Sequence, residues 1–285
     1  MITLGEGNTP LLRASRLGDR LGVELWLKWE GANPTGSFKD RGMAVAVSRA
    51  LERGANGVVC ASTGNTAAST AAYAALAGLR AVVVVPRGAV ARGKIAQARA
   101  VGAELREIDG TFEDAHLEAR RLADDEGFVN VNSINPDRIE GQSSAAREIV
   151  EQLGRVPDVL ALPYGGGGNT VAYAQGFGAA LPRFLLGEAA QRGETFASAI
   201  RISAPVHRQE VARVLERSGG TAVPLTESQL EDAWRRIARD EGVFCEPASA
   251  AGIAAVAAAG ADGAVVCVLT GNGLKDPDSA ERLAA

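Results

Sequence analysis

Short apolar runs of strand length alternate with helical segments along most of this chain, and this alternation limits the fold more than any other feature of the sequence. The runs at 58–61, 81–85, 159–162 and 264–269 consist of Val, Leu, Ala and Cys, and segments long enough for helices separate them. Strands joined through helices pair in parallel, because a hairpin turn cannot make that connection. The sequence therefore predicts an α/β protein with open parallel sheets.

Length and charge narrow the classes of function. With 285 residues the chain can form one large domain or two smaller ones. It carries a net charge of −4 and has no basic tract, which argues against nucleic acid as a partner. The longest uncharged run, 159–182, contains Pro163 and four successive glycines, so it cannot form a membrane-spanning helix. We therefore expect no membrane partner.

The N-terminus and the cysteines indicate the compartment. The first residues contain neither the basic stretch nor the apolar stretch of a secretory signal. Cys60, Cys245 and Cys267 are odd in number, far apart and without metal-ligand spacing, so we expect buried thiols and no metal site. These features predict a cytoplasmic protein.

One lysine, Lys39, lies between turn-forming residues and an Ala/Val-rich helical run. Pro34 and Gly36 favour a turn, and Ser37 is a residue type that caps the helix predicted to continue through Met43. Lys39 then falls in the first helical turn, where the positive end of the helix dipole favours a neutral amine suited to Schiff-base chemistry. Most lysines are solvated surface residues, so this interpretation depends on further motifs.

Three loops with unusual side chains follow predicted strands, and ligands of open α/β sheets bind at such strand ends. Loop 61–66 offers hydroxyls and an amide that could hold a carboxylate, although an ordinary N-capped turn has the same composition. Loop 165–170 has four glycines whose N–H groups could hold a phosphate; a flexible loop is the alternative. Loop 269–277 places the Thr270 hydroxyl where it could bond a heterocyclic nitrogen or simply satisfy a turn.

The glycine loop does not match a dinucleotide-binding fingerprint. That motif requires a third glycine where the helix packs on the sheet, and counting from Gly166 and Gly168 this position is Val171. The sequence therefore argues against a Rossmann-type cofactor.

Several segments together resemble threonine synthase, a family of fold-type II enzymes that use pyridoxal 5'-phosphate (PLP). The match extends from Gly5 to near the C-terminus. Segment 132–142 resembles the one with which that family holds the phosphate of its substrate, and it separates this family from its relatives. The other matching segments are 37–42, 62–66, 165–169, 246–251 and 269–277.

The resemblance implies which residues bind the cofactor. Lys39 is expected to form the Schiff base with PLP and to act as the general base that moves protons at the substrate carbons. Asn65 is expected to bond the 3-hydroxyl oxygen, and Thr270 to face the pyridine nitrogen with a neutral hydroxyl, which leaves that nitrogen largely unprotonated. The cofactor phosphate is expected to lie on Gly165, Gly166, Gly167, Gly168 and Asn169.

The resemblance also implies two groups of substrate ligands. One lies at the substrate end of the site, and the other takes the substrate phosphate, for which a guanidinium has suitable geometry. A surface arginine paired with Asp137 or Glu140 is the alternative for the one arginine among them. The expected ligands are Ser62, Thr63 and Thr66 at the substrate end, and Asn132, Ser133 and Arg138 at the phosphate.

The implied reaction converts O-phosphohomoserine and water to L-threonine and phosphate, by γ-elimination followed by addition of water at Cβ. The family fold implies two open parallel-sheet α/β domains with the cofactor in the cleft between them. The larger, PLP-binding domain is expected at 1–39 and 132–285, and the smaller inserted domain at 40–131. A homodimer is also expected.

Departures from the family pattern leave two alternatives open. The family usually has Asn and Ala where Gly166 and Gly167 stand, and more often has histidine where Asn272 stands. The tetraglycine is closer to serine and threonine dehydratases, so a dehydratase on the same fold is the first alternative; Arg138 argues against it. The second is a PLP-binding protein without turnover, which the short N-terminal stretch permits and the retained Lys39 argues against.

Overall fold

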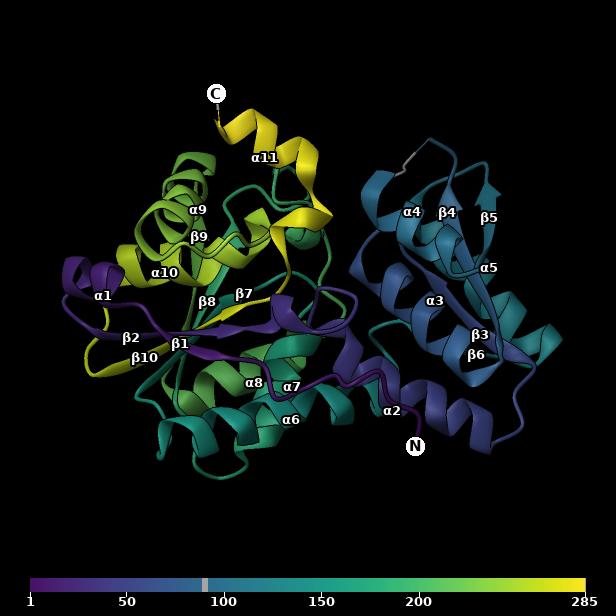
Figure 1. The fold of residues 1–285 in the computed structure, drawn as a ribbon, viewed down its shortest axis with the longest axis horizontal. Helices are drawn as coiled ribbons and strands as arrows, with labels where there is room; N and C mark the ends of the chain where they lie inside the picture. The colour runs from purple at the N-terminus through teal and green to yellow at the C-terminus, as the bar shows by residue number, and fades with distance from the viewer. Residues whose placement is uncertain (89–91, 285) are drawn as a thin grey trace. The chain divides into compact units, whose positions relative to one another are not determined.

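The computed structural model describes residues 1–88 and 92–284 and divides into two compact units. The first unit comprises residues 1–6 and 33–142, and the second comprises 7–32 and the chain from 143 onward. Each unit has its own sheet with helices on both faces (Figure 1). The predicted α/β class with parallel sheets is confirmed.

The first unit holds a four-stranded, fully parallel sheet in the order β5-β4-β3-β6. One face packs against helices through residues such as Met43, Tyr73 and Ile95, and the other through Ala115 and Leu122. The strands are β3 (Gly57–Ala61), β4 (Arg80–Pro86), β5 (Glu104–Ile108) and β6 (Phe128–Asn130); α2 (Lys39–Glu52), α3 (Asn65–Ala77) and α4 (Arg92–Ala100) cover the first face, and α5 (Phe112–Glu126) covers the second.

The second unit holds a six-stranded sheet in the order β1-β2-β10-β7-β8-β9. All neighbouring pairs are parallel except β1 and β2, which are antiparallel. The strands are β1 (Leu11–Arg13), β2 (Glu24–Trp29), β7 (Val159–Pro163), β8 (Arg183–Ala189), β9 (Thr221–Leu225) and β10 (Ala264–Leu269).

Helices cover both faces of this second sheet, and two apolar clusters fill the space beneath them. On one face lie α1 (Ser15–Leu21), α9 (Glu227–Glu241) and α10 (Ala251–Ala259); on the other lie α6 (Pro136–Leu153), α7 (Gly168–Phe177) and α8 (Arg208–Ser218). The remaining elements are α11 (Pro277–Ala284) and the 3-10 turns η1 (Glu30–Ala32), η2 (Ser198–Ile200), η3 (Pro247–Ala250) and η4 (Gly273–Lys275).

The division of the chain differs from the predicted domain bounds. The predicted insertion, 40–131, lies within the first unit, but that unit also contains 1–6, 33–39 and 132–142. The cause is close packing of two helix backbones at glycines: a Cβ on Gly42 would lie 2.8 Å from the Arg138 carbonyl oxygen, and one on Gly141 would overlap the Arg41 carbonyl oxygen. The start of α6 therefore packs with α2 in one unit.

The N-terminal segment is attached to the first unit by hydrogen bonds. The Tyr73 hydroxyl donates to the Glu6 carboxylate at 2.7 Å, and the Ile2 N–H donates to the Ser48 hydroxyl at 2.9 Å. Burial raises the pKa of the Tyr73 phenol, so this hydroxyl stays a donor.

Candidate active site

Topology places the predicted residues of each unit at the carboxyl ends of neighbouring strands. In the second unit β10 pairs in parallel with β7, so Thr270 and the glycine loop leave the sheet at the same edge. In the first unit β3 and β6 are parallel neighbours, so loop 62–66 and the segment after Asn130 share an edge as well. These are the strand ends at which ligands of open α/β sheets bind.

A buried carboxylate holds the turn that precedes Lys39. The Asp40 side chain is fully buried and accepts hydrogen bonds from the backbone N–H and the hydroxyl of Thr35, both at 2.6 Å. It also accepts from the Ser69 hydroxyl of α3 at 2.6 Å. Gly36 has a φ of +84° in this turn, which favours glycine. Asp40 therefore fixes the start of α2 against α3.

Lys39 is the first residue of α2, as predicted, but Ser37 does not cap the helix. Phe38 occupies the cap position in a helical conformation, and the Ser37 hydroxyl is buried without a hydrogen-bond partner among the described residues. The half-buried Lys39 places its Nζ 4.2 Å from the centre of the Phe38 ring. Lys39 thus extends from the N-terminus of α2, and its amine lies against the Phe38 ring.

Loop 62–66 is not an ordinary N-capped turn. Helix α3 begins at Asn65 behind Gly64 and has no side-chain cap. The Ser62 hydroxyl accepts from the Gly64 N–H at 3.1 Å, and Thr63 is half-buried. Asn65 and Thr66 are buried in the first helical turn, with exposed fractions of 6% and 9%. The N-terminus of α3 therefore has no side-chain cap, and the N-terminus of a helix suits an anion.

The side chain of Asn132 is engaged with the end of β3. It accepts from the Ala61 N–H and donates to the Ala61 carbonyl oxygen, both at 2.9 Å, and it is buried. Two further asparagines shape this segment: the Asn130 side chain accepts from the Asn132 N–H, and the Asn135 side chain donates to the Asn130 carbonyl oxygen. Ser133 lies half-buried between them. Asn132 thus joins the two predicted substrate loops.

Arg138 is buried and is not paired with a carboxylate among the described residues. Its Nη1 donates to the Val131 carbonyl oxygen at 3.0 Å and its Nη2 to the Gln142 side-chain oxygen at 3.3 Å, while Nε has no partner in the described part of the chain. Only 1% of the residue is exposed, and burial lowers the pKa of the guanidinium to about 10. At neutral pH it therefore remains a cation with neutral partners.

The acidic neighbours of Arg138 in sequence bind other arginines. Arg49 on α2 pairs with Asp137 at 2.5 Å and with Glu140 at 2.7 Å, and Arg53 also contacts Asp137. The alternative in which Arg138 is a surface residue paired with Asp137 or Glu140 is therefore wrong. Sequence alone gave no signal for this, because only the packing of α2 on α6 brings Arg49 to those carboxylates.

The glycine loop forms a surface without side chains at the start of α7. A Cβ on Gly165 would lie 3.2 Å from both the Ala199 carbonyl oxygen and the Ile202 Cδ1, whereas one on Gly166 would meet only Ile202 at 3.7 Å. Gly167 has a φ of +89° and serves as the cap residue of α7, and Gly168 begins the helix. Backbone N–H groups at this helix start are therefore accessible to an anion.

The side chain next to this loop also indicates a polar ligand. Both amide atoms of Asn169 are buried and have no hydrogen-bond partner among residues 1–88 and 92–284. Buried amide groups without partners are costly and rare in native proteins. The loop and Asn169 together fit the phosphate group of a cofactor.

Thr270 is buried at the end of β10 and belongs to a group of polar side chains. Its hydroxyl donates to the Glu246 carboxylate at 3.3 Å and lies 3.2 Å from the Ser249 hydroxyl. Thr270 is therefore more than a satisfied turn residue, because a carboxylate and a second hydroxyl converge on it. The sequence carries no signal for this contact of Glu246 and Ser249, although both lie in a matched segment.

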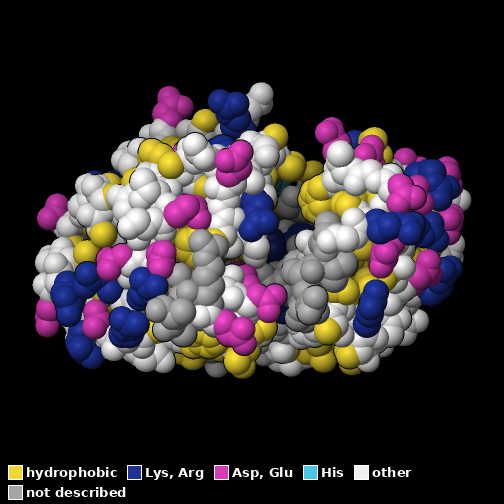
Figure 2. Space-filling model, turned by 90° about the horizontal axis from the view of Figure 1, so that it is seen from above, with side chains coloured by type: hydrophobic (Ala, Val, Ile, Leu, Met, Phe, Trp, Pro, Cys, Tyr) yellow, Lys and Arg dark blue, Asp and Glu magenta, His cyan; other side chains and the backbone are white. Residues whose placement is uncertain are grey.

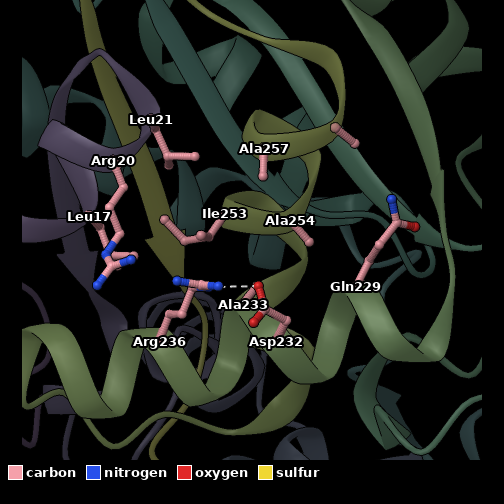
Figure 3. A pocket seen from close by; sticks show the side chains of 11 residues that line it. Leu17, Arg20, Leu21, Gln229, Asp232, Ala233, Arg236, Ile253, Ala254 and Ala257 are labelled. Atoms are coloured by element: carbon pink, nitrogen blue, oxygen red, sulfur yellow. Dashed lines mark hydrogen bonds and ion pairs between the residues drawn. The ribbon is translucent and has the colours of Figure 1, made fainter.

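A cavity of the second unit lies away from the predicted site residues. It has a volume of about 450 Å³ and lies between α1, α9 and α10, where Ile253 and Ala254 form an apolar floor and Arg236 pairs with Asp232 (Figure 3). No predicted site residue lines it.

The surface charge and the character of the helices bear on the predicted partners. Basic and acidic side chains are interspersed over the face shown in Figure 2. Within the described residues, no helix combines the length and apolar character needed to cross a membrane. The three cysteines are free and buried, as predicted.

Comparison with known proteins identifies the family. The model of the pyridoxal-phosphate dependent enzyme family matches residues 2–271. The chain is 48% identical to the threonine synthase of Synechocystis sp., covering 98% of this chain and 80% of that protein, and 46% identical to the threonine synthase of Halalkalibacterium halodurans, covering 98% and 86%. Its fold matches maize serine racemase with a TM-score of 0.85 at 23% identity, covering 98% and 92%.

The residues present fit the cofactor of that family. The glycine loop and Asn169 offer a phosphate site, Lys39 offers an amine at a helix N-terminus, and Thr270 offers a buried hydroxyl. The fold, the strand-end loops and the full-length similarity agree. The chain therefore belongs to the pyridoxal-phosphate dependent enzymes and, within them, to the threonine synthase family.

Proposed function

We propose that this chain is a threonine synthase that converts O-phosphohomoserine and water to L-threonine and phosphate with PLP as cofactor. When bound, PLP supplies the electron sink that allows protons to leave carbon. The chain's own residues bind and orient the cofactor and the substrate and move the protons.

Lys39 is assigned the Schiff-base and proton-transfer role. It is the first residue of α2, and the turn held by Asp40 fixes the backbone from which its side chain extends. Gly165 to Asn169 are assigned the cofactor phosphate, Asn65 the 3-hydroxyl oxygen and Thr270 the ring nitrogen. The helix starts of α7 and α3 support these assignments.

The buried guanidinium of Arg138 is the observation that favours a phosphorylated substrate over serine or threonine. A fully buried cation is costly unless an anion accompanies it, and the described residues supply only a carbonyl and an amide oxygen. A substrate phosphate supplies the missing negative charge and uses the unpartnered Nε. Serine and threonine, the substrates of the dehydratase alternative, carry no such group.

Ser133 and Arg138 are assigned to bind the substrate phosphate and to stabilise it as it leaves. The Asn132 side chain is already bonded to Ala61, so we assign its contribution to its backbone and to holding the segment in place. Ser62, Thr63 and Thr66 are assigned to the amino-acid end of the substrate.

The test compares Arg138→Met with the control Arg53→Ala. Arg53 contacts Asp137, the residue before Arg138, but its side chain is exposed, so its removal should leave kinetics unchanged. Because a charge-assisted hydrogen bond is worth about 1.5 to 3 kcal/mol, we expect Arg138→Met to lower kcat/KM for O-phosphohomoserine by about tenfold to a hundredfold. PLP affinity and any dehydration of L-serine should change little.

The controls separate the alternatives. Equal losses with both substrates, together with a lower melting temperature, would mean that Arg138 only supports the fold. Unchanged rates with both would favour a dehydratase, and no product from O-phosphohomoserine, L-threonine or L-serine with the unmodified protein would favour a binding protein without turnover. The expected cytoplasmic homodimer stays a prediction that light scattering and cell fractionation can check.

A further inference from the structure

The first turn of α2 contacts the backbone of Arg138 in the first unit. A Cβ on Gly42 would lie 2.8 Å from the Arg138 carbonyl oxygen and 3.2 Å from the Arg138 Cβ. One on Gly141 would overlap the Arg41 carbonyl oxygen, so the two helices cross with their backbones in contact. Gly42 lies three residues after Lys39, about 4.5 Å along the helix axis. One helical turn therefore carries the lysine and supports the arginine.

This contact fixes the point at which the helices cross, but a second contact is needed to fix the angle between them. Crossing angles are set by side chains that interlock along the contact, and glycines provide none. Arg49 lies seven residues after Gly42, about two turns further along α2, and therefore on the same face. Its side chain reaches the start of α6 there, so it is placed to set this angle.

The contact that Arg49 makes is an ion cluster with two carboxylates of α6. Its Nη1 donates to Asp137 at 2.5 Å and to Glu140 at 2.8 Å, and its Nη2 donates to Glu140 at 2.7 Å. A guanidinium that bonds both oxygens of one carboxylate and also a second carboxylate has a defined geometry, unlike a single surface ion pair. Arg53 adds one contact with Asp137 at 3.2 Å, and 59% of its side chain is exposed. Arg49 is therefore the main link.

The two carboxylates flank Arg138 in the sequence of α6, so the cluster holds the helical turn from which Arg138 extends. Within the described residues, the Arg138 guanidinium has no ion pair of its own, and its hydrogen bonds go to the Val131 carbonyl oxygen and to Gln142. Gln142 belongs to the same helix, so it moves with Arg138 when α6 turns. The direction of the guanidinium thus depends on the angle of α6.

We propose that Arg49 is a positioning residue that holds the start of α6 at a fixed angle to α2 and so directs the Arg138 guanidinium toward the substrate phosphate. This inference rests on the proposed function in one respect, the assignment of Arg138 to that phosphate. Arg49 acts through Arg138 alone, so its loss weakens the binding of a phosphate and leaves the binding of PLP unchanged.

The experiment titrates the PLP-loaded protein with inorganic phosphate by calorimetry and also measures KM for O-phosphohomoserine. PLP occupies its own phosphate site, so added phosphate reports the site at Arg138. We expect Arg49→Met to weaken phosphate binding about threefold to tenfold and to raise KM by a similar factor. Arg49→Lys keeps the charge without the planar guanidinium and should recover part of the affinity. Arg53→Ala is the control on the same face of α2 and should bind phosphate as the wild type does.

A double variant tests whether Arg49 acts through Arg138. Arg138→Met should abolish most phosphate binding, and Arg49→Met combined with it should cause no further loss. Losses that add would mean that the two residues act independently, which would overturn the inference. Equal weakening of phosphate and PLP by Arg49→Met would show general support of the fold and would overturn it as well.

The remaining outcomes separate this inference from the proposed function. If Arg138→Met leaves phosphate affinity and KM unchanged, the placement of the substrate phosphate at Arg138 fails. If Arg138→Met weakens both and Arg49→Met weakens neither, only the positioning role of Arg49 is overturned. Should Arg49→Met fail to fold, Glu140→Ala decides, because Glu140 is exposed and supplies two of the bonds to Arg49. Wild-type phosphate affinity in Glu140→Ala would then overturn the inference.

Discussion

Asp40 and Lys39 are adjacent residues with opposite environments, and this contrast explains the local chemistry. Asp40 is fully buried with three hydrogen-bond donors at 2.6 Å, so its side chain has one position. Lys39 is half-buried at the helix start, and its Nζ contacts an aromatic ring. The turn is therefore rigid while the amine remains accessible for reaction, as pre-organised catalysis requires.

We predict that Lys39→Ala abolishes threonine formation without unfolding the protein. Lys39 is the half-buried first residue of α2, and alanine is a good helix former, so we expect urea unfolding to shift little. After borohydride reduction, mass spectrometry of the wild-type peptide should show PLP on residue 39. Lys39→Arg, which keeps the cation but cannot form a Schiff base, is the control. Near-wild-type activity in either variant would refute the assignment.

Single residues were predictable where the chemistry is local. The sequence placed Lys39 at a helix start because Pro34 and Gly36 precede an apolar helical run, and the structure agrees. It predicted Ser37 as the cap, which is wrong, because the carboxylate of Asp40 stabilises the turn from inside the helix. That contact also depends on Ser69, distant in sequence, so no local pattern reveals it.

At the scale of elements, two glycines of the loop before α7 differ in the space around them. A Cβ fits at Gly166, with one neighbour at 3.7 Å. At Gly167 it would lie 2.8 Å from Val211 and 3.1 Å from His207 of the segment leading into α8, on a backbone with a φ of +89°. Gly167 is therefore needed for the conformation of the loop, whereas we assign the space beside Gly166 to the ligand.

We predict opposite outcomes for two matched substitutions in this loop. Gly166→Ala should leave the stability of the apoprotein unchanged and weaken PLP binding, because its methyl group enters the space of the phosphate. Gly167→Ala should lower the free energy of unfolding by about 1 to 3 kcal/mol, the usual cost of left-handed backbone strain. Urea unfolding and PLP titration measure the two effects. Weaker stability in both variants, with equal PLP affinity, would move the phosphate site elsewhere.

A second prediction at this scale concerns Asn132, whose side chain links the end of β3 to the segment after β6. Asn132→Ala leaves the N–H and carbonyl of Ala61 without partners, so we expect a loss of about 1 to 3 kcal/mol in the free energy of unfolding. Ser133→Ala, the control in the same segment, should keep that stability and instead raise KM for O-phosphohomoserine. If Asn132→Ala altered only KM, the Asn132 side chain would be a ligand of the substrate and not a structural link to β3.

The elements themselves were predictable to different degrees. The strand predicted at 264–269 has the bounds of its apolar run, because turn residues follow that run directly. The pair β1 and α1 was missed, since three and seven residues are too short for periodicity and α1 has no side-chain cap. Helix α10 begins at Ala251 and not at Pro247, because Pro247 starts a 3-10 turn.

At the scale of the whole molecule, the division into units depends on contacts between residues that are far apart in the sequence. The family resemblance predicts an inserted segment at 40–131, but the structure has Lys39 and Arg138 in the same unit as that segment, and glycine contacts join them to it. Backbone crossings at Gly42 and Gly141 are visible only once α2 and α6 are placed. The predicted site residues lie in short motifs that can be recognised without a structure, whereas the contact of Glu246 with Thr270 depends on the pairing of η3 with the end of β10.

The cysteines allow the two units to be observed separately. Cys60 is buried in the core of the first unit, and Cys245 and Cys267 are buried in one core of the second. Burial raises the pKa of all three thiols, that of Cys60 to about 11, so few are thiolates at mildly alkaline pH. We predict that none reacts with a thiol reagent in the native protein and that all three react after denaturation.

Because each unit has its own core, labelling during a urea titration should report two events. A smaller unit buries a smaller fraction of its surface, so we expect Cys60 to become reactive at a lower urea concentration than the other two. Cys245 and Cys267 share a core and should become reactive together. Peptide mass spectrometry of the labelled protein identifies each site. A common midpoint for all three would mean that the units unfold as one cooperative body, and separate midpoints for Cys245 and Cys267 would contradict their shared core.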